Sequence, residues 1–214
     1  MGKLYGGIYG RVHGKVGNLV HYQLMGEEII RMVGKSMGPP SVRQLACRME
    51  MAVVVAFFKP MVEFINLGYR AEAALVNKLP NNLAVSYNKK YALTGSYPEV
   101  AIDYAKARVA EGTLSMADGA AVLAESEGLK FTWDVPAGLD WNEKGHLAMT
   151  LAYFPMLNKA VYCMAGAKRK EGVDMLHIPK DLRGEYMETY LSFLAVGDNV
   201  VANSVYTGSF NKPA

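Results

Sequence analysis

The segment Gly10–Val16 (GRVHGKV) contains the glycines and the lysine from which phosphate-binding loops are built. Such a loop needs four residues between its glycines, followed by Lys and then Ser or Thr. Here only Arg11, Val12 and His13 separate the two glycines, and Val16 stands where the magnesium-binding hydroxyl is required. The pattern excludes a P-loop. It indicates instead glycines that permit tight turns, bulges or close backbone packing.

The histidines are dispersed along the chain. His13, His21, His146 and His177 form no H-x-x-x-H or H-x-x-E pattern. A zinc site would therefore need ligands assembled from distant segments, which the sequence does not predict.

The two cysteines are also far apart, and this count predicts no disulfide framework. Cys163 lies in a predicted apolar strand, where a thiol is normally buried and inert. Cys47 lies on a predicted helix near Arg43 and Arg48, and these cations would lower the pKa of the thiol. A structural role is nevertheless favoured for both thiols.

Carboxylate pairs such as Glu125 with Glu127 and Asp134 with Asp140 fall in predicted strand and turn segments, which favours surface positions. Glycoside hydrolysis needs two carboxylates about 5–10 Å apart across a cleft, and the sequence places none so. No G-x-S-x-G motif is present. We therefore expect a protein that is not an enzyme and that carries no cofactor and no metal.

The basic residues are concentrated near the N-terminus. Residues 1–60 contain eight Lys or Arg and three Asp or Glu. Residues 61–214 contain fifteen Lys or Arg and seventeen Asp or Glu. This excess is compatible with a nucleic-acid or other anionic partner, but it favours a solvated face or pairing with the acidic remainder of the chain.

The composition, 51% hydrophobic and 20% charged, is that of a globular protein. The longest apolar run, Met51–Phe58, is too short to span a bilayer, and the first residues lack the apolar segment of a secretory signal. We expect a cytoplasmic protein or a component of a virion or other particle, without membrane insertion.

The first 97 residues are predicted to form a β-hairpin and two helices. The hairpin comprises residues 18–24 and 28–33 around a turn at residues 25–27. A long helix begins at the capping-box sequence Ser41–Gln44, is interrupted at Pro60 and ends at Gly68. A shorter helix is predicted at residues 82–93.

After Tyr97–Pro98 the pattern becomes that of short strands separated by turn residues, which is typical of a sandwich or barrel. The first predicted strand covers residues 101–109, and Trp133 is predicted to be a core residue. The predicted class is α+β and mostly β: residues 1–97 form the hairpin and helical region, and residues 98–214 form an antiparallel immunoglobulin-like or fibronectin-like β-sandwich.

Several segments together resemble a known family. They include GKVGNLV at residues 14–20, QLACR at 44–48, GSYP at 95–98 and NSVYTG at 203–208. In their order and spacing they resemble Bacteroidetes proteins of about this length, described only as a domain of unknown function. The resemblance implies no activity, cofactor or catalytic residue.

Two hypotheses follow. In the first, the chain is a structural protein that self-associates as a homo-oligomer through its Gly-rich N-terminal strands, as in a phage-derived particle or an appendage. In the second, it is a binding module for a carbohydrate, peptide or nucleic acid. The candidate interface residues are Lys15, Asn18, Tyr22, Arg31, Lys35, Arg43 and Trp141.

Overall fold

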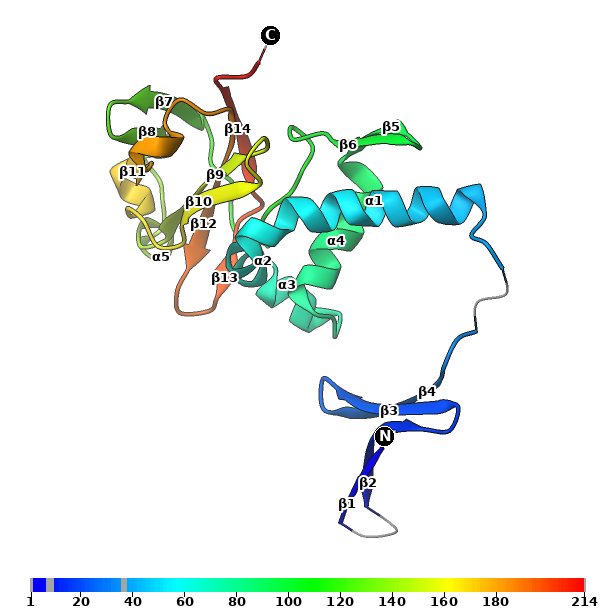
Figure 1. The fold of residues 1–214 in the computed structure, drawn as a ribbon. Coiled ribbons are helices and arrows are strands. Elements are labelled where there is room, and N and C mark those ends of the chain that lie inside the picture. Colours follow the sequence, from blue (N-terminus) through cyan, green and yellow to red (C-terminus); the bar gives the residue numbers. More distant parts are fainter. Residues whose placement is uncertain (1, 7–9, 36–37, 214) are drawn as a thin grey trace. The chain divides into compact units, whose positions relative to one another are not determined.

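The computed structural model describes residues 2–6, 10–35 and 38–213 (Figure 1). Within the Gly-rich segment, Gly7, Ile8 and Tyr9 lie outside the described residues, as do residues 36 and 37 of the predicted loop. The chain divides into two compact units, Met1–Ser41 and Val42–Ala214. The predicted boundary at residues 97 and 98 lies inside the second of these units. Each unit is described separately.

The first unit is a four-stranded antiparallel sheet with the order β1-β2-β3-β4. Its strands are β1 (Lys3–Tyr5), β2 (Arg11–Val16), β3 (Leu19–Leu24) and β4 (Glu27–Met32). The predicted hairpin is confirmed as β3 and β4. The sequence prediction missed β1 and β2, because glycines interrupt their alternation of apolar and polar residues.

Glycine conformations shape this sheet. Gly17 has a φ of 57° in the two-residue turn between β2 and β3, and Gly26 has a φ of 88° between β3 and β4. Positive φ angles of this kind suit the tight turns whose twist matches that of paired strands. Gly14, with a φ of 98°, lies within β2 at the point where the pairing partner changes from β1 to β3.

The second unit begins with helices: α1 (Val42–Phe58), the 3₁₀ turn η1 (Lys59–Met61), α2 (Val62–Gly68), α3 (Arg70–Leu75) and α4 (Pro80–Tyr91). The predicted interruption at Pro60 is confirmed, because proline lacks the amide hydrogen that a continuous helix requires. The shorter predicted helix corresponds to α4, which starts two residues earlier with Pro80 in its first turn. The prediction missed α3.

The combined helical segment Val42–Gly68 is 27 residues long and is apolar enough to cross a membrane by length and composition alone. The core helix of a water-soluble protein passes the same test, so the match is weak evidence for a membrane span. In this structure one side of the segment packs into a core, with Val54, Phe57, Phe58, Met61 and Phe64 fully or almost fully buried.

Two larger sheets follow the helices. The five-stranded sheet contains β9 (Leu147–Phe154), β10 (Lys159–Cys163), β12 (Met187–Ala195), β13 (Val200–Val201) and β14 (Val205–Phe210). The three-stranded sheet contains β7 (Ala121–Glu125), β8 (Gly128–Thr132) and β11 (Val173–His177). The hairpin of β5 (Leu93–Ser96) and β6 (Glu99–Ile102), the helix α5 (Trp141–Lys144) and the turns η2 (Arg169–Glu171) and η3 (Lys180–Leu182) complete the unit.

The strand predicted at residues 101–109 is wrong beyond Ile102. The chain turns there, and Lys106 forms a 2.8 Å ion pair with Asp103. The backbone amide of Val109 donates to the Ser204 hydroxyl at 3.0 Å, so a long-range contact replaces a strand ladder.

The five-stranded sheet is buried on both faces. In β9, Met149, Leu151 and Tyr153 join a cluster with the helices, whereas Ala148, Ala152 and Phe154 join a cluster with the three-stranded sheet. This alternation follows from the two-residue period of a strand. The unit therefore has three layers: helices, the five-stranded sheet and the three-stranded sheet (Figure 1).

The predicted α+β class, with mostly antiparallel strands and a few helices, is confirmed. Trp133 is buried in the cluster between the sheets, as predicted, and its indole donates to the Arg169 carbonyl at 2.7 Å. The narrower immunoglobulin-like sandwich is not established, because helices cover the second face of the five-stranded sheet.

Candidate functional site

The first unit brings three of the predicted interface residues to one face of its sheet. Lys15 lies opposite Val20, and Val20 lies opposite Arg31, so these side chains form a row across three strands. Tyr22 is two residues beyond Val20 and shares that face. The guanidinium of Arg31 lies 6.0 Å from the centre of the Tyr22 ring. This basic face has two cations beside an aromatic ring.

The other predicted residues lie elsewhere. Asn18 is in the turn between β2 and β3, where its carbonyl accepts the Val33 amide at 2.8 Å. Lys35 follows β4 and is exposed. Arg43 and Trp141 belong to the second unit, in α1 and α5. Trp141 is 83% exposed in a helix whose capping box is formed by Asp140 and Glu143.

Part of the opposite face of the N-terminal sheet is apolar, and it borders His21, which lies opposite Ile30. Val16 lies opposite Leu19, Leu19 lies opposite Met32, and Ile30 is two residues from Met32. Their exposed fractions are 50%, 40%, 70% and 60%, for Val16, Leu19, Met32 and Ile30. We call these four residues the apolar face. No described residue of the first unit is buried, so this sheet has no hydrophobic core of its own.

Sequence reasoning missed the apolar face, although one signal was present. Ile29 and Ile30 are adjacent in β4, and adjacent residues of a strand point to opposite faces. A strand that is apolar on both faces needs cover on both. The prediction assigned this strand to an isolated hairpin and gave no element that covers either face of the strand.

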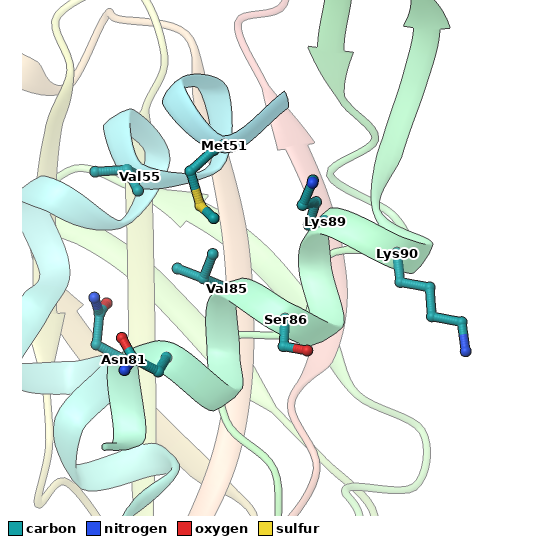
Figure 2. Close-up of a pocket in the computed structure, with 8 residues that line it drawn as sticks. Met51, Val55, Asn81, Val85, Ser86, Lys89 and Lys90 are labelled. Atoms are coloured by element: carbon teal, nitrogen blue, oxygen red, sulfur yellow. The ribbon is translucent and has the colours of Figure 1, made fainter. Parts of the chain in front are cut away.

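A groove of about 540 Å³ lies between α1 and α4 in the second unit (Figure 2). Its floor is apolar and its rim carries amides, a hydroxyl and ammonium groups; the lining residues are Met51, Val55, Val85, Asn81, Asn82, Ser86, Lys89 and Lys90. The α4 residues recur every four positions and therefore face α1 together. A ligand here would gain apolar contact on the floor and hydrogen bonds at the rim.

The groove exists because α1 is apolar on two sides. Val54 and Phe57 face the core, whereas Met51 and Val55 remain almost half exposed on the groove side. The sequence prediction expected one buried face. The uninterrupted apolar run Met51–Phe58 was the signal that a second face needs explaining.

Cys47 lies near this groove and contacts a lysine. The Lys89 ammonium donates to the Cys47 sulfur at 3.1 Å and forms a 3.4 Å ion pair with Glu50. The hydrogen bond to Cys47 raises the pKa of Lys89. The cation beside this exposed thiol is thus Lys89 of α4, rather than the arginines of the same helix that the sequence suggested.

The second unit also buries a carboxylate among tyrosines. Glu188 in β12 is 2% exposed and accepts hydrogen bonds from the hydroxyls of Tyr186 and Tyr206, the latter at 2.6 Å. Burial, together with the hydrogen bond to Glu188, raises the pKa of Tyr206 to about 12. Burial likewise raises the pKa of Tyr104 and Tyr186. The sequence signal was a glutamate inside an apolar strand.

A second buried polar cluster surrounds Arg169. Its guanidinium donates to the carbonyls of Ser115 and Met116 at 2.9 and 3.0 Å and lies 4.5 Å from the Phe193 ring centre. The pKa of nearby His146 is lowered, first by desolvation and then by Arg169. Within the described ranges, no group of three or more His, Cys, Asp or Glu residues is placed to hold a metal ion.

Comparison with known proteins identifies a family and nothing beyond it. A model described as "Family of unknown function (DUF6266)" matches residues 11–208. No curated protein and no solved structure matches the chain.

Proposed function

We propose that this chain, which belongs to the DUF6266 family of unknown function, is a structural protein that self-associates through residues 1–41. The observation that carries the proposal is the apolar face, Val16, Leu19, Ile30 and Met32, on a unit whose described residues include none that is buried. A sheet of this size needs an apolar face that is covered to be stable in water. A second copy supplies such cover.

In this proposal residues 42–214 are the rigid scaffold, with the facing five- and three-stranded sheets serving as an immunoglobulin-like sandwich. The scaffold has two hydrophobic clusters, one on each face of its five-stranded sheet. A cytoplasmic assembly, or a phage-derived particle or appendage, is the setting that we propose. The chain acts there through binding surfaces and not as an enzyme.

Light scattering on the full chain tests the proposal. The wild-type mass should exceed the 23.4 kDa of one chain. Val16→Glu places a charge in the apolar face and should lower the mass of the assembly. Val173→Glu is the matched control, because Val173 is also an exposed strand-end valine, in β11. A monomeric wild type, or an equal effect of both substitutions, would refute the proposal.

A specific observation also supports the alternative of nucleic-acid binding. The first unit has five Lys or Arg and two Glu, a balance of +3, and the rest of the chain balances to zero. Lys15 and Arg31 lie on one face beside Tyr22, which suits phosphates and a stacked base. Binding to single-stranded DNA should weaken steeply with salt, and Lys15→Gln should reduce the salt slope by about 1. In a gel mobility-shift assay, a DNA shift that does not change with salt concentration, or the absence of any shift, would exclude this alternative.

A further inference from the structure

The outer edge of β4 is open. All six residues of β4 pair with β3 in an unbroken register, and in the part of the chain that the structure describes no strand pairs with the other edge (Figure 1). An open edge is a template for another strand, and natural sheets commonly block it with charged side chains, most often lysine, with proline or with a bulge. The sequence of β4, EEIIRM, contains neither lysine nor proline, and the charges that it does carry, on three of its six residues, are of both signs.

Two charges on this strand have no ionic partner among the residues that the structure describes. No described residue forms an ion pair with Glu27 or Arg31, whereas the neighbouring Glu28 is 3.4 Å from Arg11. Glu27, Ile29 and Arg31 alternate along β4 and therefore share one face of the sheet.

We infer that β4 of one copy pairs with β4 of a second copy, antiparallel, about a two-fold axis that passes through Ile29. This inference rests on the proposed self-association and specifies the contact that begins it. The partner is a second copy of this chain, because the sequence of β4 is complementary to itself in one register.

Charge selects that register. Directly opposed residues of antiparallel strands lie on the same face, so a two-fold pairing must be centred on a residue. Centring on Glu28 opposes two glutamates, and centring on Arg31 opposes two arginines. Centring on Ile30 forms no ion pair. Only centring on Ile29 places Glu27 of each copy opposite Arg31 of the other. The two-fold axis then generates two Glu27–Arg31 ion pairs, one on each side of Ile29.

The pairing joins two four-stranded sheets into one continuous sheet. Ile29 of each copy then meets its equivalent at the axis, flanked on both sides by a Glu27–Arg31 pair. On the other side of the sheet Glu28 of each copy lies opposite Ile30 of the other, and the two Ile30 side chains are diagonal neighbours, so the two apolar faces lie on the same side of the joined sheet for the next contact. Two different two-fold contacts on one unit allow an assembly to grow.

Charge reversal in the full chain tests the register. Glu27→Arg and Arg31→Glu, made separately, each turn two attractive cross-strand pairs into two repulsive ones. Each should raise the dimer dissociation constant about tenfold or more, as measured by analytical ultracentrifugation. The double variant Glu27→Arg/Arg31→Glu restores both pairs and should bind within about threefold of wild type. Failure of the double variant to recover would overturn the inference.

A cross-link provides a second readout that does not depend on charge. In a chain with Cys47→Ser and Cys163→Ser, Ile29→Cys places two thiols across the axis, where opposed Cβ atoms lie about 4.5–5.5 Å apart. Oxidation should convert this variant to a covalent dimer. Leu24→Cys, on the same face but in β3, should remain monomeric on a denaturing gel. Equal cross-linking of both variants would overturn the inference.

The two proposals fail differently. A wild-type protein that is monomeric refutes the proposed self-association and the β4 contact together. A wild-type oligomer whose mass Val16→Glu lowers, but that neither Glu27→Arg nor Arg31→Glu weakens, refutes the β4 contact and leaves the proposed function standing.

Discussion

Replacing Phe64 by alanine tests whether the helices pack on the five-stranded sheet as described. Phe64 in α2 is fully buried, and its ring lies edge-on to that of Tyr162 in β10, with centroids 5.8 Å apart. A buried Phe→Ala substitution costs about 3–5 kcal/mol, because apolar contact is lost and a cavity remains. We expect the free energy of unfolding to fall by that amount.

Val62 provides the control on the same helix. It lies two residues earlier and is 42% exposed, so Val62→Ala should cost at most about 1 kcal/mol. Equilibrium urea unfolding, followed by tryptophan fluorescence in a Trp141→Phe background that leaves Trp133 as the one indole, measures both variants. Trp133 is buried in the cluster between the two sheets, so its emission reports on the sheet and not on the helix itself. An unchanged m-value makes the two midpoints comparable.

Equal and small costs at the two positions would refute this arrangement. That result would mean that α2 does not pack on the sheet, as expected if the apolar segment Val42–Gly68 left the protein core for a membrane. A large cost at Phe64 alone would assign the segment to the core.

Three further substitutions test particular environments. The raised pKa of Tyr206 means that stability present below about pH 10 is lost as pH rises towards 12. In urea unfolding at alkaline pH, Tyr206→Phe should therefore reduce this loss of stability. An unchanged dependence of the free energy of unfolding on pH would contradict the contact between Tyr206 and Glu188. The lowered pKa of His146 beside Arg169 means that stability present above about pH 6.5 is lost on acidification. His146→Gln should reduce this loss, as measured by melting temperatures between pH 7 and pH 4. The same dependence of melting temperature on pH in the variant and the wild type would contradict this assignment. Gly17→Ala should destabilise the β2–β3 turn by about 1–2 kcal/mol, because φ is positive at this position. The added Cβ would meet nothing within 4 Å, so the cost comes from the backbone conformation alone. Unaltered amide hydrogen exchange in β2 and β3 would contradict this strain.

The elements that sequence predicted best are those fixed by local chemistry. Pro60 cannot continue a helix, and the structure breaks the helix there. After Tyr97–Pro98 the sequence predicts short strands between turn residues, and the structure contains β7 to β12 in that part of the chain. In both cases a few neighbouring residues decide the outcome.

The elements that sequence missed depend on residues far apart in the chain. The strand expected up to Val109 gives way to a turn because Ser204 accepts the Val109 amide, a partner 95 positions away. The common face of Lys15, Tyr22 and Arg31 follows from a register across three strands, which no single segment specifies. Trp141 was grouped with these residues by type alone, and the structure places it in the other unit.

The contrast between the two units indicates which of them binds a partner. Residues 42–214 bury two apolar clusters on both faces of a central sheet, and their charges balance. Residues 1–41 bury none of their described residues, expose Ile30 and Met32, and carry the whole net charge of +3. Exposed apolar side chains contribute nothing to the stability of a free sheet, and net charge opposes its compaction. Such a unit gains stability from what it contacts, so binding to a partner and its own folding are expected to be linked.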